Sequence, residues 1–170
     1  MSAHQEFLEA AMPHLDVVWS LARRMTLDTQ AAEDLVQETF LRAFVGFGSH
    51  RGGDLRPWLV SICLNTARSD GRRRRRRPPE DLEADPANHL PASTQVDAEA
   101  LAVVEHDEIV AALGQLPEPQ RQSILLVDLA GLSAQQAADV LGAPRGTVLA
   151  RVHRGRRRLA QLLVAEEAEP

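Results

Sequence analysis

The sequence predicts an all-α protein: two small helical domains joined by a flexible acidic linker, with a helix-turn-helix in the C-terminal domain. Apolar residues recur at three- and four-residue steps, and no segment alternates usefully with a period of two. A proline-rich, acidic stretch interrupts this periodicity at 78–97. Near the end of the chain, a glycine separates a short helical pattern from a longer one. We therefore place the domains at 1–77 and 98–165, with the linker at 78–97.

The composition is that of a globular protein with one or two domains. The chain has 170 residues, of which 44% are hydrophobic, 25% charged and only 4% aromatic. The single cysteine, Cys63, excludes an internal disulfide and a multi-cysteine zinc site. No apolar run approaches the roughly 18 residues of a membrane span, and the N-terminus lacks the pattern of a secretory signal. We therefore expect a cytoplasmic protein without membrane insertion.

The first domain is expected to contain three helices. Residues 5–25 and 30–45 each show amphipathic spacing, and four glycines then break the pattern in a loop at 46–54. Asp54 is a suitable N-cap for a third helix, whose first turn tolerates Pro57. The apolar positions of the second and third helices are Ala32, Leu35, Val36, Thr39, Phe40, Ala43 and Phe44, then Trp58, Leu59, Ile62 and Ala67.

The second domain is expected to begin with two helices and to end with a helix-turn-helix. Asp97 can cap a helix to about Leu116, and another helix is expected at about 118–130. Ser133 is expected to cap a short helix that ends at Gly142, because glycine readily adopts the left-handed conformation that stops a helix.

After the turn, a basic helix beginning near Arg145 is suited to the major groove of DNA. Its first residues are the best placed to reach base edges, and its later arginines to contact phosphates. The candidate DNA contacts on this helix are Arg145, Thr147, Arg151 and Arg154.

Charge is strongly segregated along the chain, although the net charge is only -5. All 19 basic residues are arginines. The net charge is +7 over 56–77, -9 over 78–108 and +6 over 145–158. Arginine clusters of this kind indicate surfaces that bind phosphate.

Three segments resemble, in the same order, conserved regions of bacterial RNA polymerase sigma factors. AAEDLVQETFLRAF (31–44) resembles the second region, and LRPWLVSICLNTARSDGRRRRRR (55–77) is similar to the following helix, which reads the promoter −10 element in that family. Residues 116–159 are similar to the fourth region. The short length and the variable linker resemble the extracytoplasmic-function (ECF) group. The resemblance implies a factor that binds core RNA polymerase and promoter DNA, duplex at −35 and melted at −10, under the control of an anti-sigma factor.

The resemblance also implies roles for individual residues in the first domain. A polar-acidic face on the second helix would dock on the coiled coil of the largest polymerase subunit. Asn65 matches an asparagine that holds an extruded −10 base, and its amide can both donate and accept hydrogen bonds. The docking residues are Glu33, Asp34, Gln37 and Glu38.

The loop at 46–54 matches a family loop that holds the flipped base. This chain has His50 before Arg51 where the family usually has phenylalanine, and the imidazole can still stack on a base. The arginines at 72–77, represented by Arg72, Arg73 and Arg74, would contact backbone phosphates.

Other functions remain open. The chain has no GxxxxGK[ST], HExxH or GxSxG motif, so we expect no enzymatic activity, no cofactor and no metal. An autonomous helix-turn-helix regulator would not need the patterns at 31–44 and 55–77. A sigma-like mimic that sequesters regulators would not need a basic recognition helix. Cys63 is expected in the core.

Overall fold

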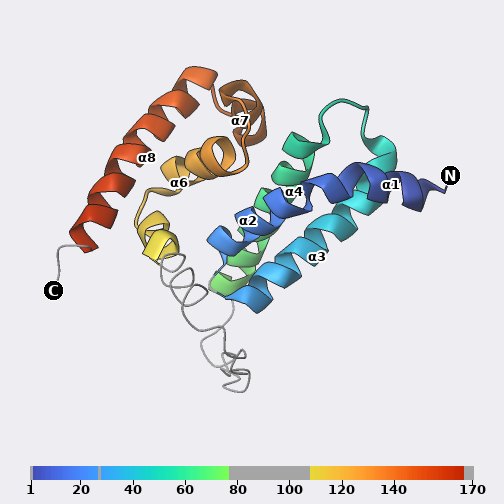
Figure 1. Ribbon diagram of the computed structural model, residues 1–170, viewed down its shortest axis with the longest axis horizontal. Helices are drawn as coiled ribbons and strands as arrows, with labels where there is room; N and C mark the ends of the chain where they lie inside the picture. Colours follow the sequence, from blue (N-terminus) through green and yellow to red (C-terminus); the bar gives the residue numbers. More distant parts are fainter. Residues whose placement is uncertain (1, 27, 77–107, 167–170) are drawn as a thin grey trace, which may run out of the picture.

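The structure is a computed structural model, and it confirms the all-α prediction. It describes residues 2–26, 28–76 and 108–166, apart from the side chains of 73–76 and 165–166. Within these ranges the chain forms helices and short connections, with no strand. The linker expected at 78–97 lies outside the described residues. We refer to residues 2–76 as the N-terminal lobe and to 108–166 as the C-terminal lobe (Figure 1).

The first expected helix is in fact three segments. Helix α1 (Ala3–Ala11) is followed by a single 3₁₀ turn, η1 (Met12–His14), and by α2 (Leu15–Met25). The prediction of one continuous helix over 5–25 was therefore wrong. Pro13 explains the break, because proline has no backbone N–H and its ring clashes with the preceding helical turn.

Helices α3 (Thr29–Gly46) and α4 (Leu55–Arg76) complete the N-terminal lobe, separated by the 3₁₀ turn η2 (Phe47–Ser49) and a loop. Asp28 caps α3, with its Oδ1 accepting a hydrogen bond from the backbone N–H of Ala31 at 2.7 Å. Asp54 precedes α4 as predicted, and its Oδ1 accepts from the N–H of Arg56 at 3.0 Å. Helices α2, α3 and α4 pack against one another around a core of Leu, Val, Ala and Cys63 side chains.

The C-terminal lobe contains a helix at 108–114, then α6 (Glu118–Ile124), α7 (Ala134–Leu141) and α8 (Arg145–Glu166). The helix expected over 118–130 is α-helical only in its first half. After Ile124 it continues as a π turn, η4 (Leu125–Leu129), in which the N–H of Ala130 bonds the carbonyl of Leu125 at 2.9 Å.

Helix α8 crosses α6 at short range. A Cβ added at Gly155 would lie only 2.6 Å from Cδ1 of Ile124 and 3.4 Å from Cβ of Gln120. Gly155 is itself buried. A glycine at this position therefore allows α8 to lie close to α6.

The two lobes are packed together. Helix α7 lies beside the beginning of α4, and the π turn lies beside α2 (Figure 1). Among the described residues, buried apolar side chains of both lobes form one hydrophobic cluster. Helices α3 and α8 lie at opposite outer edges of the molecule (Figure 1).

Candidate nucleic-acid interface

The candidate docking residues share the exposed side of α3. Asp34 is exposed, and its Oδ1 accepts a hydrogen bond from Nε2 of Gln30 at 3.2 Å. Glu38 is half-buried and accepts a hydrogen bond from Nε of Arg42 at 2.6 Å. An ion pair of this i,i+4 type contributes only about 0.3–0.5 kcal/mol, so a partner can displace it at little cost. The four candidates are Glu33, Asp34, Gln37 and Glu38.

Apolar side chains that the sequence analysis did not identify extend this side of α3. Leu41 is 62% exposed and Val45 is 85% exposed. They follow Asp34 by 7 and 11 residues, a spacing that returns to the same helix face and could have revealed them. Phe44, expected in the core, is 42% exposed. Its ring makes edge contacts with His4 and Phe7 of α1.

The loop after α3 places an imidazole beside an indole. His50 is half-buried, with its ring centroid 5.0 Å from that of Trp58 and the two planes tilted by 39°. Nε2 of His50 is buried and has no hydrogen-bond partner in the described part of the chain. Arg51 is exposed, and Gly52 and Gly53 follow with φ of 83° and 95°, which favour glycine. The loop therefore presents a half-buried imidazole, packed beside an indole, next to an exposed cation.

Asn65 and Arg72 lie on one side of α4. Both are exposed, and their seven-residue separation corresponds to about two helical turns. Asn65 uses its backbone carbonyl to accept the Ser69 hydroxyl at 2.9 Å. The side chains of Arg73 and Arg74 lie outside the described residues.

The helix-turn-helix forms as predicted. Ser133 and Gln136 form a reciprocal capping box at the start of α7, and Gly142 ends it with φ of 63°. Helix α8 buries Val148 and Val152 on its inner side. Of the candidate DNA contacts, Arg145 and Arg154 are exposed, whereas Thr147 and Arg151 are half-buried. The −10 and −35 candidates thus lie on different lobes and are not brought into one site.

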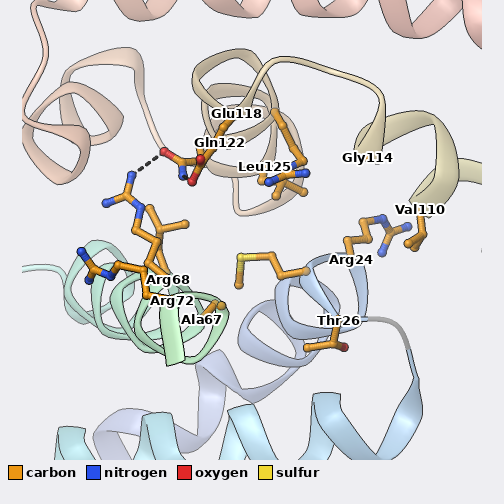
Figure 2. Close-up of a pocket in the computed structure, with 14 residues that line it drawn as sticks. Arg24, Thr26, Ala67, Arg68, Arg72, Val110, Gly114, Glu118, Gln122 and Leu125 are labelled. Carbon is orange, nitrogen blue, oxygen red and sulfur yellow. Dashed lines mark hydrogen bonds between the residues drawn. The ribbon is translucent and has the colours of Figure 1, made fainter. Parts of the chain in front are cut away.

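A cleft of about 700 Å³ lies between the lobes (Figure 2). Arg68 of α4 donates a hydrogen bond to Oε1 of Gln122 in α6 across it (Figure 2). Gln122 in turn donates to Glu118 at 2.7 Å. The cleft lining is strongly basic. Its arginines are Arg24, Arg68, Arg72 and Arg121.

Cys63 is fully buried, as expected, and burial raises its pKa to about 12, with an opposing effect of the Thr39 hydroxyl. In the part of the chain that is described, no three His, Cys, Asp or Glu side chains are grouped to hold a metal ion. No helix there has the length and apolarity needed to cross a membrane.

Comparison with known families gives two matches in the order of the lobes. Sigma-70 region 2 matches residues 11–77, and Sigma-70 region 4 matches residues 106–159. The first match contains α2, α3 and α4, and the second contains the helix-turn-helix.

Full-length relatives and solved structures agree with these matches. The ECF RNA polymerase sigma factor EcfG of Rhodopseudomonas palustris is 38% identical over 94% of this chain and 84% of its own. The RNA polymerase sigma-H factor of Pseudomonas aeruginosa is 34% identical over 86% of this chain and 80% of its own.

Among solved structures, the sigma factor RpoE in complex with the anti-sigma factor NepR from Bartonella quintana is similar. It has a TM-score of 0.73 and 29% identity over 94% of this chain and 97% of that one. CnrH in complex with the cytosolic domain of CnrY has a TM-score of 0.71 and 25% identity, covering 95% and 90%. The lobes, their order and these relatives together show that the chain belongs to the ECF group of RNA polymerase sigma factors.

Proposed function

We propose that this chain docks on core RNA polymerase through the acidic side of α3 and directs it to promoters read by both lobes. Sigma factors are non-enzymatic initiation factors, so binding energy drives promoter melting. The proposal assigns region 2 to residues 1–77, the linker to 78–97 and region 4 to 98–165. Because sigma factors act on transcription, we place the protein in the cytoplasm.

The proposal rests on one observation: an acidic surface and a basic surface lie at opposite edges of the molecule. The acidic side of α3 and the basic helix α8 lie far from each other in Figure 1. One edge can therefore contact the polymerase while the other contacts duplex DNA. A helix-turn-helix regulator that acts alone would have no use for the first surface.

In the N-terminal lobe, we assign the −10 contacts to the loop and to α4. His50 and Arg51 would stack on and pair with an extruded base, and the exposure of Arg51 and the half-buried ring of His50 beside Trp58 support this role. Asn65 would bond a base edge from the exposed side of α4. Arg72, Arg73 and Arg74 would hold the backbone phosphates.

In the C-terminal lobe, we assign the −35 contacts to Arg145, Thr147, Arg151 and Arg154. Arg145 is at the first position of α8, where recognition helices reach base edges. A bidentate contact from arginine to guanine contributes about 1–3 kcal/mol of discrimination. Arg154, about two and a half turns further along α8, suits a phosphate.

We further propose that an anti-sigma factor regulates this chain. The similar RpoE and CnrH structures are complexes with NepR and with the cytosolic domain of CnrY, respectively. We assign the arginine-lined cleft and the exposed side of α3 as surfaces that such a partner would contact.

Transcription reconstituted with core polymerase on a genomic fragment library tests the proposal. Addition of the chain is expected to produce a defined set of start sites that core polymerase alone does not use. An unchanged pattern would refute the proposal. Binding of an operator duplex by the free chain, with no effect on polymerase, would instead favour the autonomous regulator.

A further inference from the structure

We propose that Asp128 is a positioning residue for promoter reading. Through its contact with Arg156 it fixes the rotation of α8 about the helix axis, and this rotation determines which side chains of α8 face the DNA. The inference deepens the proposed function, because it rests on the assignment of α8 to the −35 element. The contact itself lies within the C-terminal lobe and involves no partner.

The arginines in the middle of α8 are alike in sequence but differ in their surroundings. Five arginines lie within residues 151–158. Arg156 places its Nε 2.9 Å from Oδ2 of Asp128 and donates from Nη2 to Oδ1, across 28 residues of sequence. A two-point contact fixes the orientation of the planar guanidinium as well as its distance. Arg156 can therefore report the rotation of α8 to the turn that carries Asp128.

The π turn η4 holds Asp128 in place. Leu125 and Leu126, in the same turn, are buried in the core. The N–H groups of Ala130 and Leu132 bond the carbonyls of Leu125 and Leu126 at 2.9 and 3.0 Å. Single π turns within helices are frequent at functional sites. The carboxylate therefore belongs to a segment that the core fixes.

The apolar packing of α8 leaves its rotation weakly defined at this level. The buried row of α8 consists of Val148, Val152 and Gly155, and Gly155 has no side chain with which to contact Ile124. Apolar contacts are also non-directional. Arg156 comes next, about 100° further round the helix. Its two-point contact supplies a directional constraint where the glycine supplies none.

This rotation directs other arginines away from the protein. Arg154 and Arg157 lie on the side of α8 opposite the buried row, and both are exposed. Arg156 lies roughly a quarter turn from the buried row, and its charge is paired. Arg157 therefore joins Arg154 as a phosphate contact, whereas Arg156 contributes none.

A small rotation is enough to disturb base reading. A group about 6 Å from the helix axis moves by about 3 Å when the helix rotates by about 30°. That displacement is as long as a hydrogen bond. Loss of the contact is thus expected to reduce discrimination between sequences more than general attraction to DNA.

Binding of the holoenzyme to two promoter fragments tests the proposal. One fragment is a promoter that the holoenzyme selects, and the other is the same fragment with its −35 sequence replaced. Asp128→Asn removes the charge, and Arg156→Lys removes the two-point geometry. Each is expected to lower the ratio of the two affinities about fivefold, the lower end of what one base contact supplies. Arg157→Gln is the control and is expected to weaken both fragments equally.

The salt dependence of binding separates the neighbouring arginines. Arg157→Gln is expected to make the slope of log K against log salt concentration shallower by about 0.9, as loss of one phosphate contact requires. Arg156→Gln is expected to leave the slope unchanged. An equal change of slope in the two variants would overturn the proposal.

Asp128→Asn distinguishes positioning from simpler effects. Removal of a negative charge near DNA would by itself tighten binding to both fragments, and a purely structural loss would weaken both equally. Only positioning lowers the ratio. Unchanged ratios in Asp128→Asn and Arg156→Lys would overturn the proposal.

The free chain gives a measurement that needs no polymerase. Exchange of the Arg156 Nε–H with water, followed by NMR, is expected to be about fivefold faster in Asp128→Asn than in the wild type. Equal rates would show that the pair does not form in solution and would overturn the proposal. Failure of the wild-type holoenzyme to select any promoter would instead refute the proposed function, and the exchange rates would still report the pair.

Discussion

Arg156 of α8 binds both carboxylate oxygens of Asp128 in the π turn. Nε of Arg156 lies 2.9 Å from Oδ2, and Nη2 donates to Oδ1. The hydrogen bond and charge of Asp128 raise the pKa of Arg156 above its ordinary value. This two-point geometry fixes α8 against the preceding turn. Within the described part of the chain, Arg156 is the arginine of α8 whose charge is engaged in an ion pair.

Arg156→Ala is expected to lower the free energy of unfolding by about 0.5–1 kcal/mol, since the side chain is 60% exposed and water weakens the pair. The loss should shrink in high salt. Urea titration at two salt concentrations measures it. Arg157→Ala, at an exposed neighbouring position, is the control and should change stability much less. Equal losses in the two variants would show that the ion pair contributes nothing.

Gly155→Ala is expected to destabilise the C-terminal lobe. Overpacking against Ile124 costs about 1–3 kcal/mol, which exceeds the roughly 0.5–1 kcal/mol that alanine gains over glycine within a helix. Thermal denaturation should show a lower Tm. Gly146→Ala is the matched control, because a Cβ there meets nothing within 4 Å.

Adding Ile124→Val to Gly155→Ala removes the methyl group that the new Cβ would meet at 2.6 Å. Part of the lost stability should return. If Gly155→Ala proves as stable as Gly146→Ala, the close approach of α6 and α8 would not require glycine.

Cys63 is expected to make the protein sensitive to alkali. Because the pKa of the folded thiol is raised to about 12, its contribution to stability is complete below about pH 9 and is lost as the pH rises toward 12. The chain has no tyrosine and no lysine, so Cys63 is the side chain that titrates in this window.

Urea titrations from pH 8 to 11 measure the effect. The unfolding free energy of the wild type should fall by up to about 1.4 kcal/mol per pH unit above pH 9, whereas that of Cys63→Ala should stay nearly flat. The folded thiol should also resist thiol reagents at pH 8. Parallel curves for the two proteins would contradict the prediction.

Local signals made the helix-turn-helix predictable from the sequence. Ser133 and Gly142 determine the helix ends next to them in the sequence. The structure confirms that Ser133 caps α7, that α7 ends at Gly142 and that α8 begins at Arg145. Pro13 is also a local signal, but the surrounding amphipathic spacing obscured it.

Features that depend on the tertiary structure could not be predicted in this way. The contact of Gln136 with Asp54 joins residues 82 apart, and neither residue type specifies a partner. The exposure of Phe44, which the spacing placed on the apolar face, depends on which helices pack against α3, and periodicity alone does not define that packing.

Reversing the charge of Asp34 tests the docking surface. Asp34→Arg is expected to abolish co-purification with core polymerase while leaving the circular dichroism spectrum and Tm unchanged, because the side chain is exposed. Asp16→Arg, on the exposed side of α2, makes the same charge change elsewhere and should still bind. Retention of Asp34→Arg on the polymerase would refute docking through α3.

Replacing Arg145 or Arg151 tests base reading. Each alanine variant is expected to lose about 10- to 100-fold of transcription at some promoters and little at others, as loss of one base contact worth about 1–3 kcal/mol requires. Arg154→Ala should weaken all promoters similarly and reduce the salt dependence of binding. A uniform loss with Arg145→Ala and Arg151→Ala would show that these residues contact phosphates instead.

The hydrophobic cluster shared by the lobes has a consequence for how the protein denatures. Buried side chains of the two lobes pack against each other, so neither lobe has a complete hydrophobic core of its own in this arrangement. Heating the intact chain should melt both halves in a single cooperative transition. Either half produced alone would expose apolar surface to solvent, and we expect it to aggregate.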